Sequence, residues 1–235
     1  MRLGIETTAV HQDDCADQML AGSKAVSKYP TKRDAAPCFA TGTKLITLAG
    51  EKQVEEIAVG DKVLTADNGF KPVAWTGRRT MTAEDLATYP QLRPIRIAKG
   101  VFGNSRPLTV SPQHGLIIRH NGTEQLVRAH QIADMFGPQA AQVDKDVASV
   151  TYHHLMFDQH ELVFAEGALT EAFFPGPNAI ASLDQDARAE LFLIFPELEK
   201  ILSDGVLPRD VFGGAARRYL AELPAHTAAS DSLAA

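Results

Sequence analysis

Two short segments of the sequence carry residue types that could do covalent chemistry. Cys38 is one of two cysteines, and it stands where a leader of mixed composition gives way to strand-rich sequence. The second segment, Ser111-Pro112-Gln113-His114, supplies a hydroxyl and an imidazole. A thiol becomes a useful nucleophile when a neighbour lowers its pKa or takes its proton, and histidine is the usual partner near neutral pH. The two segments therefore predict a nucleophilic cysteine that works with a histidine.

The sequence alone does not select the histidine that partners Cys38. The chain between the thiol and each candidate is long enough for almost any geometry, and the candidates are His114, His153, His154 and His160. A purely structural interpretation is also open, because a cysteine beside a strand is commonly a small buried hydrophobe. In that interpretation Ser111-Pro112 only initiates a turn and His114 is a core-edge residue bonded to backbone.

The elements that must position these residues are predicted to be mainly β-strands. Asn68-Gly69 and Asn121-Gly122 between apolar runs are hairpin signals, because a type I′ turn needs positive φ at both central residues. Short helices are expected at 82–88 and from about 127 to 132. Strands are expected at 44–48, 53–57, 62–65, 70–75, 94–97, 108–110, 115–119, 123–127, 150–155 and 161–165. The sequence therefore predicts an all-β, antiparallel β-rich domain.

The segments on either side of this domain differ from it. Residues 1–36 have few large apolar side chains and no sustained period, so they are expected to be a flexible leader. Beyond Pro177 the apolar period lengthens to that of helices. Helices are expected at 184–195, 197–202 and 209–223. The organisation predicted is thus a leader (1–36), a β-rich domain (37–177) and a short helical C-terminal extension (178–235).

Composition excludes several classes of partner. The chain has 23 Lys and Arg against 29 Asp and Glu, a net charge of −6, and its basic residues are scattered, so no nucleic-acid partner is expected. No apolar run approaches the roughly 20 residues that span a bilayer, so no membrane span is expected either. Cys15 and Cys38 cannot form a disulfide framework. Both are interpreted as free thiols, with a single bridge between them as the alternative.

The start of the sequence bears on localisation. Met1 to Gln12 lacks the basic start and the apolar stretch of about 7–15 residues of a secretory signal. Cytoplasmic residence is therefore the default expectation, with non-classical export as the alternative.

Several motifs, taken in their order along the chain, resemble those of the Hint domain shared by Hedgehog C-terminal regions and inteins. They resemble the bacterial Hint-domain family more closely. The resemblance covers about residues 37–177. It rests on Pro37-Cys38-Phe39, Asp67-Asn68-Gly69, Trp75-Thr76-Gly77-Arg78-Arg79, Val110-Ser111-Pro112-Gln113-His114, and Glu166-Gly167-Ala168 through Pro175-Gly176.

The resemblance implies a role for four residues. Cys38 takes the place of the thiol that attacks the preceding carbonyl, here that of Pro37, in an N-to-S acyl shift that turns the peptide bond into a thioester. Ser111 and His114 match a motif that polarises the scissile amide and protonates its nitrogen, so His114 is the implied general acid/base. His160 matches, more loosely, a histidine that assists the second half of the reaction.

Two departures from the relatives narrow the expected activity. Residues 166–171 contain no His-Asn pair of the kind that completes splicing in inteins. The Trp75-Thr76-Gly77-Arg78 stretch lacks the acidic residue that activates a sterol in Hedgehog proteins. What remains is single-turnover self-cleavage at Pro37–Cys38. The substrate would be the protein's own leader, and the acceptor water, a small thiol or a nucleophile on another protein.

Other functions stay open beside self-cleavage. The ring of Pro37 crowds the carbonyl that must be attacked, so one alternative is an inactive Hint-fold scaffold whose helical extension docks an unknown protein partner. A cysteine hydrolase acting on other molecules is a weaker alternative, because its usual α/β fold is not indicated. His153, His154, Asp158 and His160 suggest a metal site, but adjacent strand residues point to opposite faces, so no metal or other cofactor is expected.

Overall fold

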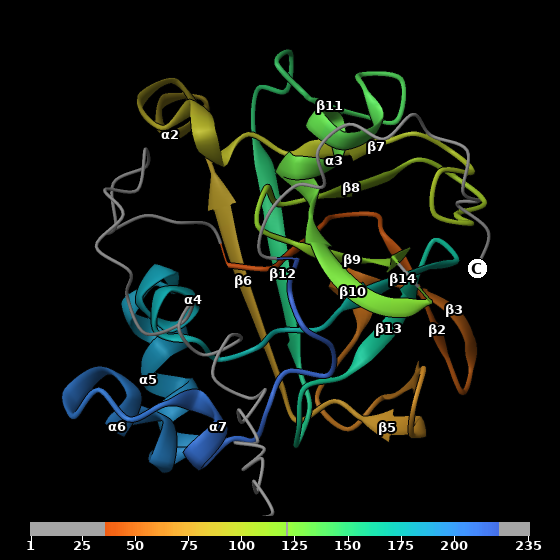
Figure 1. Cartoon of the computed structure of the whole chain (residues 1–235). Coiled ribbons are helices and arrows are strands. Elements are labelled where there is room, and N and C mark those ends of the chain that lie inside the picture. The colour runs from red at the N-terminus through yellow and green to blue at the C-terminus, as the bar shows by residue number, and fades with distance from the viewer. Residues whose placement is uncertain (1–35, 121, 221–235) are drawn as a thin grey trace, which may run out of the picture.

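The computed structural model describes residues 36–120 and 122–220, which form two antiparallel sheets followed by short helices (Figure 1). The 6-stranded sheet has the order β11 (Ala141–Val143), β7 (Ile95–Ile97), β8 (Leu108–Val110), β1 (Phe39–Ala40), β12 (Val150–Met156) and β6 (Trp75–Met81). The 8-stranded sheet has the order β10 (Thr123–Arg128), β9 (Gly115–His120), β14 (Ala168–Glu171), β13 (Leu162–Ala165), β2 (Lys44–Thr47), β4 (Lys62–Thr65) and β5 (Gly69–Pro72), with β3 (Gly50–Gln53) paired to β2. The predicted antiparallel β-rich architecture is confirmed.

The helices are short and lie between strands or after them. Those between strands are η1 (Val54–Glu56), α2 (Ala83–Thr88), η2 (Pro90–Leu92) and α3 (Ala129–Phe136). Those after the last strand are α4 (Pro177–Ser182), α5 (Gln185–Ile194), η3 (Pro196–Leu198), α6 (Glu199–Ser203) and α7 (Pro208–Val211). Asp184 accepts the Ala187 N–H at 2.8 Å and so caps the start of α5, and the predicted helix ends before Pro196.

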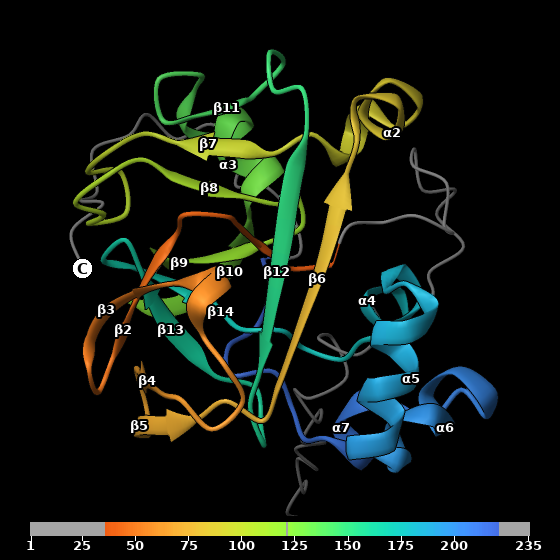
Figure 2. The same ribbon diagram turned by 180° about the vertical axis from the view of Figure 1, so that it is seen from behind.

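Strands β6 and β12 are the longest of the strands in residues 36–120 and 122–220, and they lie side by side (Figure 2). Their register pairs His154 with Gly77 and Met156 with Trp75. β1 pairs with the other edge of β12. The segment that begins with Cys38 is therefore held between β12 and β8, in the middle of the 6-stranded sheet.

The buried side chains form two clusters, one on each side of β1 and β12. Phe39, Val110 and Leu155 belong to a cluster between the two sheets. Cys38 and Trp75 belong to a second cluster, which also takes up Ile180, Leu191, Leu198 and Ile201 from the helices after the last strand. Because the helices share this core with Cys38, they help to enclose the cysteine.

The strand predicted at 53–57 is wrong. β3 ends at Gln53, and residues 54–56 form the 3-10 helix η1. Val54 and Ile57 are both buried, and a spacing of three residues puts them on the same side of a 3-10 helix. The predicted strand at 70–75 is likewise divided between β5 and β6, with Val73 and Ala74 in neither.

The long helix predicted at 209–223 is also wrong where the structure describes it. Helix α7 ends at Val211, and Gly213 has a φ of +96°, which a right-handed helix does not accept. Residues 218–220 instead run along β10, where Tyr219 forms a parallel bridge with Leu126. Residues 221–223 lie outside the described part of the chain.

The predicted leader falls almost wholly outside the described residues. Of residues 1–36, the structure describes only Ala36, which is buried, and Cys15 lies outside it. Cys38 has a free thiol. Among the helices of residues 36–120 and 122–220, none is long and apolar enough to cross a membrane.

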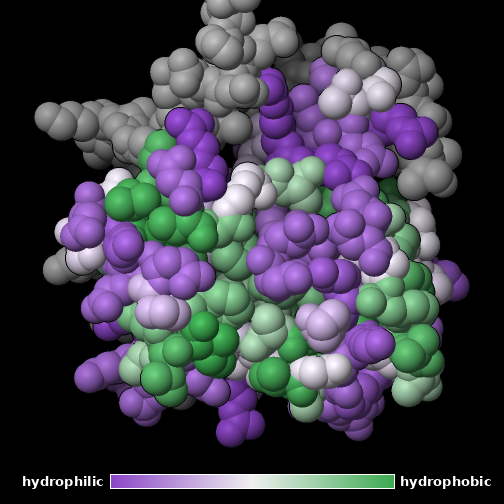
Figure 3. Space-filling view, turned by 90° about the horizontal axis from the view of Figure 1, so that it is seen from below, coloured by the Kyte–Doolittle hydropathy of each residue, from purple (hydrophilic) through white to green (hydrophobic). Residues whose placement is uncertain are grey.

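The molecular surface carries apolar patches among hydrophilic side chains, as the view from below shows (Figure 3). In the helices after the last strand, the exposed large apolar residues are Leu193, Ile194 and Leu202. Docking of a protein partner by this extension stays a prediction.

Candidate active site

The pairing of β1 with β12 brings Cys38 and His154 together. Phe39 is opposite His153, so the next pair along, Cys38 and His154, points to the other face of the sheet. Cys38 Sγ lies 3.5 Å from His154 Nδ1 and 3.7 Å from His154 Nε2. Because the two distances are nearly equal, the sulfur lies between the two ring nitrogens and is aligned with neither of them.

His154 also contacts the carbonyl that precedes Cys38. His154 Nδ1 is 3.2 Å from Pro37 O, and a carbonyl oxygen can only accept a hydrogen bond. Nδ1 therefore carries the proton and donates it to Pro37 O. Because a neutral imidazole carries one proton, Nε2 is left free to accept one.

Ser111 holds the backbone on both sides of Pro37. Its hydroxyl donates to Ala36 O at 2.7 Å, and its Oγ accepts the Cys38 N–H at 3.1 Å. The Ser111 N–H donates to Cys38 O at 3.0 Å. The thiol of Cys38 donates to Ala36 O at 2.8 Å. Ser111, which directly follows β8, thus fixes the amide nitrogen of the Pro37–Cys38 bond.

This site is buried and electrically neutral at rest. Cys38, Ser111 and His154 are 3%, 0% and 4% exposed. Burial raises the pKa of the Cys38 thiol, although the Ser111 hydrogen bond and the charge of Arg79 oppose the shift. Burial lowers the pKa of His154 to about 4, against the opposing effect of its bond to Pro37. The resting pair is therefore a thiol beside a neutral imidazole.

His114 lies next to this site without a hydrogen bond to it. Its ring packs edge-on against Phe39, with 4.5 Å between centroids, and its side chain is fully buried. Within residues 36–120 and 122–220, neither of its ring nitrogens has a hydrogen-bond partner. Burial lowers the pKa of His114 to about 4, so it too is neutral near pH 7. The structure therefore places His114 beside the residue after Cys38.

His160 belongs to a different cluster. Its Nδ1 accepts the Ala216 N–H at 3.0 Å, and its Nε2 lies 3.5 Å from Glu171 Oε2. Its ring packs on Phe174. The structure thus brings together Cys38, Ser111 and His154, and it joins His160 to Glu171, a buried carboxylate that the sequence did not single out.

Trp75 and Gly77 support the far side of His154. The Trp75 ring is stacked parallel to the His154 ring at 6.1 Å, and a Cβ on Gly77 would lie 2.4 Å from Trp75 Cη2. Because Trp75 is fully buried, its ring has no room to move. Only glycine at position 77 therefore fits beneath this ring.

We expect Gly77→Ala to lower the free energy of unfolding by about 1–3 kcal/mol, the usual cost of overpacking a core. Urea unfolding of the variant beside wild type measures this. Gly214→Ala is the matched control, because a Cβ there meets nothing within 4 Å. Equal unfolding midpoints for both variants would contradict the tight packing of Trp75 over position 77.

The described residues also contain a groove of about 570 Å³ beside these strands. Its lining includes His154 and residues of η1 and α5, and also the side chains of Thr76, Arg78, His153 and Leu155. Strand alternation puts these side chains on the face opposite to Cys38 and His154, and His153 Nε2 meets Thr41 Oγ1 at 2.9 Å. The groove nevertheless also borders His154, the histidine that contacts Cys38. In the part of the chain the structure describes, no group of His, Cys, Asp and Glu is arranged to hold a metal ion.

Comparison with solved structures finds inteins at low sequence identity. The AceL NrdHF class 3 split intein, in a splice-inactive variant, is 17% identical over 59% of this chain and 99% of its own, with a TM-score of 0.41. The bacterial intein-like domain from Clostridium thermocellum is 16% identical over 57% of this chain and 97% of its own (TM-score 0.39). The gp41-1 intein is 16% identical over 58% and 98% (TM-score 0.35). No curated protein matches the chain.

Comparison with protein-family models matches residues 37–177 to the Hint domain. The match covers more than half of the chain, and it includes Cys38, Ser111, His114 and His154. The chain belongs to the Hint domain family.

Proposed function

We propose that this protein cleaves its own backbone at the Pro37–Cys38 bond through a thioester on Cys38. The observation that carries the proposal is the convergence of three groups on one bond. His154 Nδ1 lies 3.2 Å from the carbonyl oxygen of Pro37, and the thiol sulfur of Cys38 lies 3.5 and 3.7 Å from the two ring nitrogens of His154. A nucleophile, an electrophile and a proton carrier are thereby held together before any reaction begins.

In the first step Cys38 Sγ attacks the carbonyl carbon of Pro37. The thiol proton passes to His154 Nε2, which is the free acceptor nitrogen of that ring. The new C–S bond closes a small ring, and the electron pair of the carbonyl moves to Pro37 O. His154 Nδ1–H already donates to this oxygen, so its charge is stabilised as it develops.

In the second step the bond between the Pro37 carbonyl carbon and Cys38 N breaks. The nitrogen leaves as an amine and takes one proton, so the net transfer is from the Cys38 thiol to its own nitrogen. The Ser111 hydroxyl is in contact with this nitrogen throughout. The resemblance assigns the protonation to His114, whereas His154 already carries the thiol proton after the first step. The product is a thioester between Pro37 and Cys38 Sγ.

The thioester is then resolved by water, a small thiol or a nucleophile on another protein, which attacks the Pro37 carbonyl and returns a proton to Cys38 Sγ. The leader through Pro37 is released or transferred. Residues 166–171 contain no His-Asn pair, and Trp75-Thr76-Gly77-Arg78 contains no acidic residue, so we propose neither splicing nor sterol transfer.

An inactive scaffold is the second candidate function, and the burial of the site favours it. Cys38 is only 3% exposed, and burial raises the pKa of its thiol, which reduces the population of the nucleophilic thiolate. The two candidates differ in one measurable product, the free amine of Cys38.

Intact-mass spectrometry of the purified full chain, with and without dithiothreitol near neutral pH, tests the proposal. We expect fragments corresponding to residues 1–37 and 38–235, in amounts that increase with thiol. The Cys38→Ala variant serves as the control and is expected to stay intact. A wild-type protein that remains full length for days in thiol, while circular dichroism shows it folded, would establish the scaffold in place of self-cleavage.

A further inference from the structure

A short segment near the C-terminus lies outside the family match and packs against β10 and the cluster of His160 and Glu171. This segment, Ala216–Leu220, is called the C-terminal strap below. It is fixed to β10 by two backbone bonds, from Leu126 N–H to Arg218 O and from Leu220 N–H to Leu126 O, each 2.8 Å long. It is thus an added edge segment on the 8-stranded sheet.

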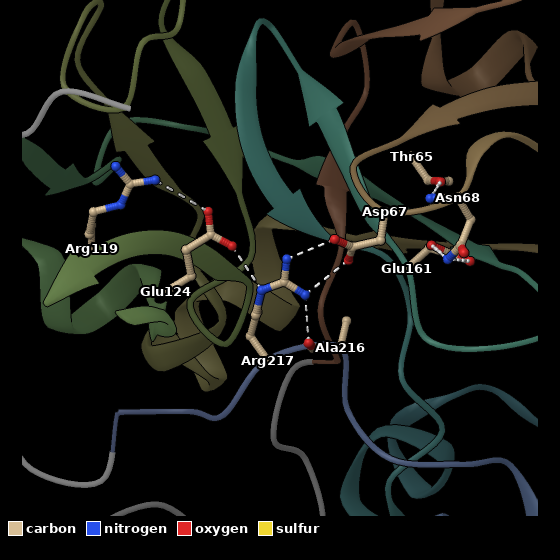
Figure 4. A network of polar contacts seen from close by, with 8 residues as sticks. All are labelled: Thr65, Asp67, Asn68, Arg119, Glu124, Glu161, Ala216 and Arg217. Atoms are coloured by element: carbon tan, nitrogen blue, oxygen red, sulfur yellow. Dashed lines mark hydrogen bonds and ion pairs between the residues drawn. The ribbon is translucent and has the colours of Figure 1, made fainter. Parts of the chain in front are cut away.

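An arginine on the strap strengthens this attachment (Figure 4). Arg217 binds both carboxylate oxygens of Asp67, at 2.8 and 2.9 Å, and also Glu124 at 2.8 Å. A guanidinium held by two carboxylates is a strong, directional contact, and it raises the pKa of Arg217 above its usual range. The strap is therefore anchored to two separate elements, the β4–β5 turn and β10.

The phenol of Tyr219 reaches one end of the Ser111–Gly115 segment through a carboxylate. Its hydroxyl donates to Glu171 Oε2, and the Gly115 N–H donates to Glu171 Oε1 at 2.6 Å. Glu171 is fully buried, so these donors replace water around its charge. Burial raises the pKa of Glu171, but the hydrogen bond from His160 and the electrostatic effects of His160, Arg128 and His114 outweigh burial and leave it lowered.

The ring of Tyr219 reaches the same segment through a second route. The guanidinium of Arg128 lies over the ring, 4.5 Å from its centroid, in a cation–π contact. Arg128 Nη1 then donates to Gln113 O at 2.7 Å. The hydroxyl of Tyr219 therefore acts on Gly115 and its ring acts on Gln113.

A second residue of the C-terminal strap, Ala216, contacts Glu171 indirectly, through His160. The Ala216 N–H donates to His160 Nδ1, so the proton of this imidazole is on Nε2, which faces Glu171 Oε2 at 3.5 Å. Strap residues thus contact Glu171 directly, through Tyr219, and indirectly, through His160. This gives His160 a function in the cluster that does not require contact with Cys38.

We propose that Tyr219 is a positioning residue for cleavage, which sets the Ser111–Gly115 segment from outside the family domain. Ser111 binds Cys38 N and Ala36 O, so a shift of this segment moves the bond that is to be cut. The inference rests on the proposed function, since positioning matters only if Pro37–Cys38 is cleaved. With this role for Tyr219, the C-terminal extension contributes to the geometry of the cleavage site.

Two substitutions of Tyr219 separate the two routes. Tyr219→Phe removes the bond to Glu171 and keeps the ring under Arg128, whereas Tyr219→Leu removes both. Thr47→Val is the control, because it deletes a buried hydroxyl that donates to Gly50 O at 2.7 Å in the same sheet, away from Cys38. All variants are made in the full chain, and each is checked by circular dichroism for folding.

We measure two quantities, the thiol-induced cleavage rate and, in a Cys38→Ala background, the amide proton shifts of Ser111 and Gly115 by NMR. Cleavage is expected to slow about 10-fold in Tyr219→Phe and about 100-fold in Tyr219→Leu, the scale of a small misplacement of reacting groups. The Gly115 amide shift is expected to change in both variants, because Glu171 loses the donor that holds it beside Gly115. Thr47→Val is expected to match wild type in both measurements.

The two measurements distinguish failure of the inference from failure of the proposed function. If wild type does not cleave, the proposed function fails, and the amide shifts alone decide whether Tyr219 holds the segment. Unchanged Ser111 and Gly115 shifts in folded Tyr219→Leu would overturn the inference. Changed shifts with cleavage as fast as in Thr47→Val would overturn it as well, because the segment would then move without consequence for the reaction.

Discussion

Replacing His154 by alanine is expected to slow cleavage at Pro37–Cys38 by about 100-fold or more, the usual contribution of a general acid–base group. His154 is the imidazole in contact with both Cys38 Sγ and Pro37 O. Without it no side-chain base in contact with Cys38 takes the thiol proton, and the developing oxyanion loses the donor that His154 supplies. The rate of appearance of the 38–235 fragment in thiol, followed by intact mass, measures the effect.

A second substitution divides the two tasks of His154. Asparagine carries an amide N–H near the position of Nδ1, so His154→Asn can still donate to Pro37 O, but it has no nitrogen that accepts the thiol proton. We expect it to cleave as slowly as His154→Ala if proton transfer dominates. Cleavage near the wild-type rate in His154→Ala would refute the assignment of His154 as the proton acceptor.

His114→Ala tests whether the acid–base group is His154, which contacts Cys38, or His114, which the family resemblance implies. The resemblance gives the acid–base role to His114, yet neither of its ring nitrogens has a hydrogen-bond partner within the described residues. We expect His114→Ala to slow cleavage less than His154→Ala does. A larger effect at His114 would mean that its ring turns toward Cys38 N during the reaction.

The choice of His154 could not be made from the sequence because it depends on strand register. Alternation along 150–155 separates His153 from His154, but it does not say which of them faces Cys38. That is decided by the pairing of Phe39 with His153, a contact between residues far apart in the chain. A slip of one residue in this register would exchange the two histidines.

The strands themselves were largely predictable, because each carries its own local signals. Apolar runs between turn residues located β4, β8 and β9 closely, whereas the spacing of Val54 and Ile57 suited a strand and a 3-10 helix alike. The strap was missed for a different reason. Val211, Phe212, Ala215 and Tyr219 recur at helical spacing, but the partners that hold Tyr219 extended, Glu171 and Arg128, are tertiary neighbours.

Acidification from pH 7 to pH 4 is expected to destabilise the folded protein strongly through His114 and His154. Both are fully buried, and burial lowers the pKa of each from 6.5 to about 4. Between these values the unfolded chain binds a proton at each site and the folded chain does not, so stability falls as the pH falls. The stability that depends on His114 and His154 staying neutral is fully present above about pH 6.5.

The size of the effect follows from the two shifts. One pKa unit corresponds to 1.36 kcal/mol, so each histidine is expected to remove about 3 kcal/mol of stability by pH 4. This is a large part of the stability of an ordinary domain. Glu171, whose pKa is lowered, acts in the same direction but at lower pH, because its contribution is lost only as the pH falls below the ordinary glutamate range.

Urea unfolding of wild type at pH 7.5, 5.5 and 4.5 measures this fall, and His114→Leu tests its origin. Leucine fills the space beside Phe39, and because His114 makes no side-chain hydrogen bond among the described residues, no partner is left unpaired. About half of the pH-dependent fall is expected to disappear in this variant. The control is His120→Gln, at a half-buried histidine at the end of β9, and this variant is expected to show the same pH-dependent fall in stability as wild type. An equal fall in wild type and His114→Leu would mean that other groups cause the acid sensitivity, and that the imidazole of His114 is not held neutral by burial.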